Sequence, residues 1–257
     1  MENILYDKNN EKLSKLIMEA GEVMLKSGGE ISRVEENMKI IAKAYGASAN
    51  VYTLSNGLFL TLYCEGDVST FVKEVPISAM NLGQVVQVNN LSRDISEGRY
   101  TVEEAFAKLN EIKKLPLADE KIRVFFAGLA GGSFSYLFGG DLYDFIAAFI
   151  ASGLLYIFTL FAINKGFPKF LRIVVGSALA TFASQILFSL GLGNDLDHII
   201  IGAIITMVPG VTLTISIREF IFEDYLSGSI HLVDALLTSM CIAVGVITMF
   251  EVYKFVF

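Results

Sequence analysis

The chain has 257 residues, of which 53% are hydrophobic, and a formal net charge of −7 at pH 7. Its mean hydropathy of +0.56 is too high for an ordinary soluble domain, and the lack of a basic stripe excludes a nucleic-acid-binding surface. Because 32 of the 47 charged residues lie within residues 1–121, we expect a small α+β domain at 1–118, followed by an α-helical membrane domain at 119–257.

The cysteines and the opening residues exclude some further classes. Cys64 and Cys241 lie in different parts of the chain, without a CxxC pattern or a neighbouring histidine, so neither a disulfide nor a zinc site is expected. The opening residues, MENILYDKNNEK, lack the apolar run of a signal peptide. We therefore expect the first domain to stay in the cytoplasm. From the cysteine pattern we also expect the chain to bind no metal, and we expect no cofactor.

Two helices are predicted at the start of the first domain. Apolar residues at helical spacing predict a helix over about 10–27, and Gly28 ends it because glycine readily adopts the left-handed conformation of a helix C-terminus. A second apolar stripe, from Ile31 to Tyr45, predicts the next helix. Ser32 and Glu35 have the spacing of a capping box at its start.

Three strands and two more helices complete this domain. Residues 48–75 form short segments rich in β-branched and aromatic residues, separated by turn residues such as Asn56-Gly57, which predicts an antiparallel meander. A third helix begins at Leu82, and Thr101 and Glu104 predict a capping box at the start of a fourth. The domain has no histidine and no catalytic motif, so no enzymatic activity is expected.

Apolar segments of nearly the ~20 residues that cross a bilayer follow. We expect five transmembrane spans, at about 122–139, 142–163, 170–190, 199–217 and 233–252. An odd number of spans is unusual for a self-contained transporter built from two similar halves. It indicates a partner subunit.

The basic residues set the expected orientation in the cell membrane, because loops rich in Lys and Arg stay in the cytoplasm. Lys165 and Lys169 lie between the second and third spans, whereas the loops GGDLYD and GLGNDLDH carry no Lys or Arg. We therefore expect the N-terminal domain and a loop at 218–233 in the cytoplasm, and the C-terminus outside.

A helix breaker lies near the middle of the fourth expected span. Pro209 removes a backbone donor, and with Gly210 it predicts a break that is tolerated only inside protein or beside a wet cavity. Broken helices near the midplane often form transporter sites, and Thr212 and Thr214 add hydroxyl groups. These residues are candidates for a substrate path. The alternative is an ordinary proline kink.

Charged residues follow the break. Arg218 is a candidate for binding a substrate carboxylate, because a guanidinium pairs with a carboxylate bidentately. Glu219, Asp224 and Asp234 are candidates for proton coupling or gating, because desolvation raises the pKa of a carboxylate toward neutrality. The alternative is that all four residues simply mark the edge of the membrane.

The chain resembles the threonine/serine exporter family (ThrE/YjjP) over nearly its whole length. The resemblance rests on three stretches, SGGEISRVEENMKIIAKAYGA, VNNLSRDISEGRYTVEEAFAKL and MVPGVTLTISIREFIFEDYLSGSIHLVDALL. It implies that the cytoplasmic domain has signature positions at Ser27, Gly28, Arg33 and Glu35. From composition alone these residues are explained as two helix ends and a turn.

The chain departs from the family pattern at three positions. Gly29 replaces a frequent alanine and Glu219 a frequent aspartate. Glu223-Asp224 replaces the usual Gly-Asp, which puts the local turn in question.

The resemblance implies a function and a partner. Members export small solutes across the cytoplasmic membrane, driven by the proton gradient or membrane potential. Long forms are associated with threonine and serine, and split forms with succinate. This chain resembles the larger half of the split form, which pairs with a separate small membrane protein. The rival hypothesis is a membrane-anchored cytoplasmic sensor or scaffold.

Overall fold

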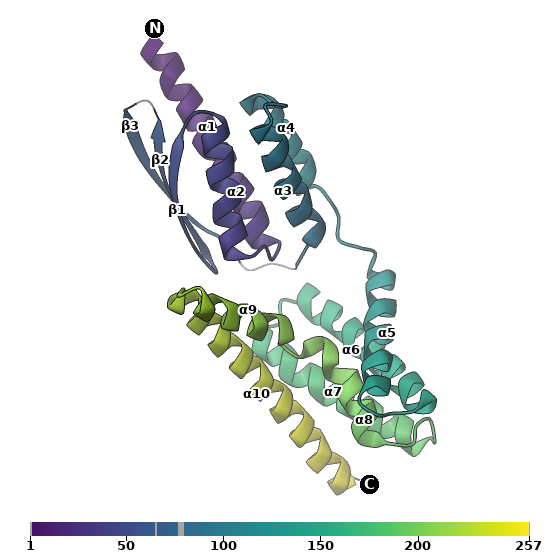
Figure 1. Cartoon of the computed structure of the whole chain (residues 1–257). Helices are drawn as coiled ribbons and strands as arrows, with labels where there is room; N and C mark the ends of the chain where they lie inside the picture. Colours follow the sequence, from purple (N-terminus) through teal and green to yellow (C-terminus); the bar gives the residue numbers. More distant parts are fainter. Residues whose placement is uncertain (1, 65, 77–79, 257) are drawn as a thin grey trace. The chain divides into compact units, whose positions relative to one another are not determined.

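A computed structural model describes residues 2–64, 66–76 and 80–256 of the chain. The chain divides into two compact units, Met1–Leu117 and Ala118–Phe257. Each unit has its own buried apolar clusters (Figure 1).

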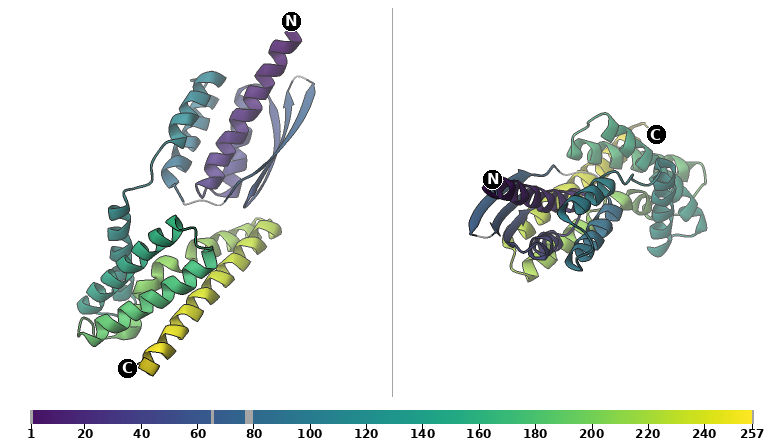
Figure 2. Two further views of the ribbon diagram at one scale, coloured as in Figure 1. Left: turned by 180° about the vertical axis from the view of Figure 1, so that it is seen from behind. Right: turned by 90° about the horizontal axis from the view of Figure 1, so that it is seen from above.

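The described part of the first unit combines helices with one small sheet. Its elements are α1 (Glu2–Lys26), α2 (Ile31–Ala44), β1 (Ser48–Leu54), β2 (Gly57–Cys64), β3 (Asp67–Glu74), α3 (Leu82–Ser96) and α4 (Val102–Lys113). The strands pair antiparallel in the order β1-β2-β3, which confirms the predicted meander. The helices lie on one side of the sheet (Figures 1 and 2).

The alternation along β2 explains this single covered face. Leu58, Leu60 and Leu62 are buried, whereas the alternating residues Phe59 and Tyr63 are 37% and 41% exposed, because successive side chains of a strand point to opposite faces. The helices supply the other side of the core, with Leu16, Ile17, Met24, Met38 and Ile41.

One predicted helix start is wrong and another is confirmed. Helix α2 begins at Ile31 with Glu30 as N-cap and no side-chain cap bond, so Ser32 lies inside the first turn. The Glu35 carboxylate, expected to close a capping box there, instead accepts the backbone N–H of Thr53 in β1 at 2.8 Å. At α4, by contrast, Thr101 and Glu104 form the predicted reciprocal box.

The described part of the second unit is entirely helical (Figure 2). Its elements are α5 (Glu120–Leu137), α6 (Leu142–Asn164), α7 (Lys169–Ser189), α8 (Leu196–Ile204), the short 3₁₀ helix η1 (Ile205–Met207), α9 (Gly210–Ile221) and α10 (Tyr225–Val256). Among the described residues, three helices have the length and hydropathy of membrane spans, namely α6, α7 and α10. The bent pair formed by α8–η1 and α9 makes a fourth if it is one span.

The first expected span is not among the described helices with the length and hydropathy of membrane spans. Helix α5 has only 18 residues, and Glu120, Lys121 and Arg123 lie in its first turn. These charges lower its hydropathy below that of a typical span. The expectation of five spans therefore stays a prediction.

The predicted loop at 218–233 is wrong. Helix α9 continues to Ile221 and α10 already begins at Tyr225, so only residues 222–224 connect them. The charges in this region were expected to mark a loop, but they cap and pair within a helical hairpin, as the contacts of Asp224 and Glu219 show.

Small residues allow α5 and α6 to approach closely, among them Gly128 and Gly132, which lie four residues apart on α5. A Cβ added at either glycine would come within 2.8 Å of a backbone carbonyl oxygen of α6, that of Phe149 or Phe145. Ser152 adds a hydrogen bond from its hydroxyl to the carbonyl of Ala127, at 2.9 Å. Such spacing is typical of tightly packed membrane helices.

Candidate functional site

The helix breaker separates two helices rather than bending one. The axes on its two sides differ by 59°, and Pro209 has non-helical dihedral angles of −82° and 47°. The N–H of Gly210 donates to the carbonyl of Val208 at 2.9 Å. A Cβ at Gly210 would meet no atom within 4 Å, so packing does not require glycine there.

The hydroxyl groups beyond the break have different roles. Thr214 donates its hydroxyl to the carbonyl of Gly210 at 2.9 Å, within the first turn of α9. Thr212 is half-buried one turn from the break. Ser216, which is fully buried, donates to the carbonyl of Gly228 in α10 at 2.8 Å. The last contact fastens the two helices of the α9–α10 hairpin together.

Arg218 lies at the far end of α9, on its exposed surface. Its guanidinium carbon is 5.5 Å from the centre of the Phe222 ring, a cation–π distance. The aromatic ring supports one side of the guanidinium.

Glu219 and His231 form a close pair across the hairpin. His231 Nδ1 lies 2.7 Å from Glu219 Oε2, and the side chains are only 21% and 11% exposed. The other carboxylate oxygen, Oε1, is buried and has no hydrogen-bond partner in the described residues. The sequence did not reveal this partner of Glu219. One sequence feature could have pointed to His231 as this partner. It is one of only two histidines in the chain, and it follows Glu219 by twelve residues.

The other two candidate carboxylates lie in separate contacts. Asp224 caps α10, where Oδ1 accepts the N–H of Ser227 at 3.2 Å. Asp234 accepts from Lys169 of α7 through both oxygens, at 2.5 and 2.7 Å. The three carboxylates expected to act in proton coupling therefore have three distinct partners, and the Glu219 side chain, 11% exposed, is more enclosed than that of Asp234, 35% exposed.

The signature residues of the first unit do not gather into one site. Ser27 is buried and donates to Gln84 of α3 at 2.7 Å, while Gly28 has the left-handed φ of 83° expected after a helix. Arg33 lies 3.9 Å from Glu30 on the surface. The Glu35 carboxylate accepts the backbone N–H of Thr53 in β1.

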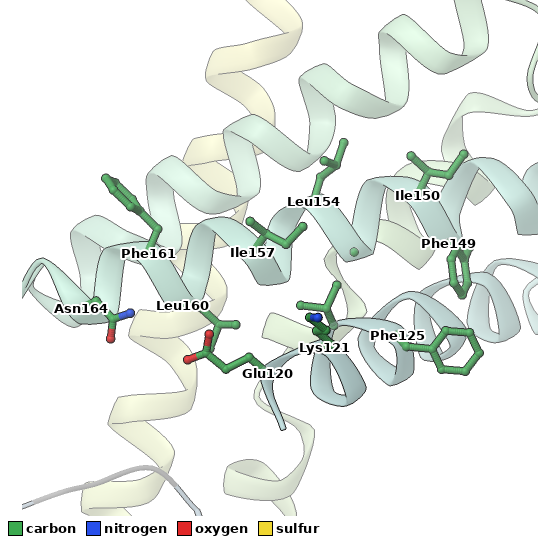
Figure 3. A pocket seen from close by; sticks show the side chains of 12 residues that line it. Glu120, Lys121, Phe125, Phe149, Ile150, Leu154, Ile157, Leu160, Phe161 and Asn164 are labelled. Carbon is green, nitrogen blue, oxygen red and sulfur yellow. The ribbon is translucent and has the colours of Figure 1, made fainter. Parts of the chain in front are cut away.

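A wide groove lies elsewhere in the second unit. This groove of about 730 Å³ runs between α5 and α6, where Figure 3 shows mostly apolar side chains, with Glu120 and Lys121 of α5 among them. Ile150, Leu154 and Ile157 on its wall are 37%, 51% and 52% exposed. No group of three or more His, Cys, Asp or Glu residues suited to a metal ion occurs in the described ranges.

Comparison with known proteins places the chain in a family. The family model described as "Putative threonine/serine exporter" (ThrE) matches residues 15–253. The chain belongs to the threonine/serine exporter family. The family match and the apolar helices together make it a multi-pass membrane protein.

Two curated members of the family are similar along most of this chain. The "Threonine/serine exporter" of Corynebacterium glutamicum is 27% identical over 239 residues, which cover 88% of this chain and 48% of that protein. The "Probable threonine/serine exporter" of Mycobacterium tuberculosis is 23% identical, covering 94% and 46%. The chain thus spans about half the length of these relatives. No solved structure matches.

Proposed function

We propose that this chain is one part of a secondary transporter that exports a small carboxylate-bearing solute, of the threonine/serine or succinate class, across the cytoplasmic membrane. Residues 1–118 face the cytoplasm and residues 119–257 form the membrane part, with α5 as a fifth span and the C-terminus outside. The names of the two related exporters support the substrate class. We place the transport site on the α9–α10 hairpin.

The observation that carries the proposal is the enclosed pair of Glu219 and His231. Glu219 follows Arg218 on α9, the helix that begins at the Pro209 break, and His231 lies on α10. Arg218 binds the substrate carboxylate, since guanidinium and carboxylate form paired, charge-assisted hydrogen bonds. Glu219 and His231 hold and release the coupling proton between them. The carbonyl and hydroxyl groups between Pro209 and Thr214 line the path, because a broken helix in a membrane exposes polar backbone.

A second membrane subunit completes the transporter in this proposal. Its support is the length of the relatives, which carry about as much chain again as the matched part. The α5–α6 groove, with apolar side chains on its walls, is the surface on which we place a helix of that subunit. The charged start of α5 supports the same placement, because a protein neighbour shields charges that lipid does not.

The test is efflux from cells that lack their own exporters, loaded with threonine, serine or succinate. Each solute is measured with this chain alone, with the candidate small subunit alone and with both. Efflux only with both would establish a two-part carrier and name its solute. No efflux of any of them, with both proteins inserted in the membrane, would overturn the proposal and favour a membrane-anchored sensor.

A further inference from the structure

The first unit contains a polar cavity that transport by the second unit does not explain. Its volume is about 400 Å³, within the range of small-molecule sites. All of its lining residues belong to the first unit, namely Glu22, Val23, Lys26, Ser27, Asn81, Gln84, Lys113, Leu115 and Leu117.

A hydrogen-bond network fixes the walls of this cavity. Ser27, only 2% exposed, donates to the Gln84 side-chain oxygen at 2.7 Å. The Gln84 amide donates onward to the carbonyl of Lys113 at 3.2 Å, and Asn81 donates to the carbonyl of Leu115 at 3.3 Å. The ends of α1 and α4 and the start of α3 are thereby held around the cavity before any ligand arrives, which lowers the entropic cost of binding.

The charges around the cavity favour an anion. Glu22 is paired with Lys73 at 2.6 Å, and Lys113 is paired with Glu19. Lys26, exposed at the last turn of α1, forms no ion pair within the described residues. The lining therefore offers one ammonium group whose charge is not neutralised, next to amide groups and the apolar side chains of Val23, Leu115 and Leu117.

We propose that this cavity binds a small organic carboxylate of about the size of an amino acid. Lys26 pairs with the carboxylate, the polar wall of Asn81 and Gln84 meets its polar groups, and the apolar wall covers its short carbon chain. The site is separate from the transport path, and its occupant contacts Leu115 and Leu117, which lead along the chain into α5.

The test is calorimetric titration of the full chain in detergent with threonine, succinate and inorganic phosphate. We expect saturable binding of at least one carboxylate, with a dissociation constant of about 1 mM or lower. Lys26→Ala is expected to weaken carboxylate binding about fivefold, because it removes one partly exposed ion pair with the ligand. The matched control is Lys43→Ala, which removes an exposed lysine from the last turn of α2 and is expected to change it less than about twofold.

A further variant separates this site from the transport path. Arg218→Ala is expected to stop efflux and to leave this binding unchanged, so the two proposals fail independently. Absence of saturable carboxylate binding, an equal affinity in Lys26→Ala, tighter binding of phosphate than of either carboxylate, or loss of binding in Arg218→Ala would each overturn the assignment.

Discussion

Glu219 and His231 approach each other from consecutive helices, with Oε2 2.7 Å from Nδ1, and both side chains are largely shielded from solvent. The short connection at residues 222–224 makes this meeting possible, because it turns the chain sharply back beside α9. The pair brings a carboxylate and an imidazole, two groups that can pass a proton between them, into direct contact.

Neutralising either member of this pair is expected to remove the pH dependence of efflux. Glu219→Gln keeps the size of the side chain but cannot release a proton, and His231→Gln keeps a polar side chain without a titrating ring. Efflux from loaded vesicles is measured across a series of external pH values. His198→Gln, which alters the other histidine of the second unit, is the control and should leave the profile as in the wild type. An unchanged profile in both pair variants would remove the pair from coupling.

Arg218→Ala is expected to abolish efflux while the protein stays in the membrane. The reason is the loss of the only group in the proposed path that carries the charge needed to hold a carboxylate. The matched control is Arg172→Ala, at a half-buried position in α7, which should retain efflux. Membrane fractionation checks insertion of both variants. Normal efflux from Arg218→Ala would exclude this residue from substrate binding.

Glu223→Gly is expected to stabilise the chain. Glu223 is the only non-glycine residue with positive φ in the described ranges, at 64°, and a side chain in this conformation costs roughly 1–2 kcal/mol. Glycine removes that strain but gains freedom in the unfolded chain, so the net gain is about 0.5–1 kcal/mol. Thermal unfolding in detergent measures it.

Glu223→Ala is the matched control for this substitution, since it removes the charge and keeps the Cβ. It should show no gain. A rise as large in Glu223→Ala as in Glu223→Gly would mean that charge rather than backbone strain decides the stability of this turn.

The sequence predicted local features well where the signal and its cause are close together in the chain. The meander follows from turn residues beside the strands, and the box at Thr101 from two side chains three residues apart. Ser32 and Glu35 have the same spacing, yet Glu35 binds Thr53. Spacing alone cannot show that a distant strand will compete for a carboxylate.

The same limit explains the wrong loop at 218–233. A hydropathy scale counts each charged residue as unfavourable in a membrane helix. It takes no account of a side chain elsewhere in the chain that pairs with the charge. Within the expected loop Glu219 is paired with His231, and just beyond it Asp234 is paired with Lys169, so both charged residues lie on helices. The pairings depend on how α7, α9 and α10 pack, which no single segment of the sequence encodes. The helix break at Pro209, a local property of proline, was predicted.

The first unit is expected to lose stability as pH rises from about 10 to about 12. Burial, with smaller contributions from the Glu104 and Glu103 carboxylates, raises the pKa of Tyr45 from 10.0 to about 12. Below pH 10 the Tyr45 phenol is protonated in both the folded and the unfolded state, so its full contribution to the free energy of unfolding is present. Between the two values only the folded state keeps the proton, so unfolding becomes more favourable with pH.

Tyr45→Phe tests this effect, with denaturant unfolding followed at neutral and alkaline pH. The variant also loses the hydrogen bond from Tyr45 to the carbonyl of Tyr100, at 3.0 Å, which lowers its stability at neutral pH by about 1 kcal/mol. Its stability should then fall less steeply than that of the wild type above pH 10. Parallel curves for the two proteins would assign the alkaline loss to other groups.

Gly153→Leu is expected to block assembly with the second subunit without unfolding the chain. Gly153 lines the α5–α6 groove, and an added Cβ would have only one neighbour, at 4.0 Å. A leucine there fills the groove instead of clashing within the chain. Co-purification with the small subunit measures assembly. Ala243→Leu, at an exposed position of α10, is the control, and equal recovery of the subunit with both variants would place its contact elsewhere.

The length of α10 locates the Glu219–His231 pair along the bilayer normal. The helix has 32 residues, or about 48 Å, well beyond the ~30 Å of hydrocarbon. Glu251 and Lys254 mark its polar end, and the hydrocarbon thickness measured back from Glu251 ends about 20 residues earlier, at His231. With Glu251 placed at one edge of the hydrocarbon, the pair falls at the other edge, where acyl chains give way to headgroups and a proton reaches it from bulk water without entering the oily interior.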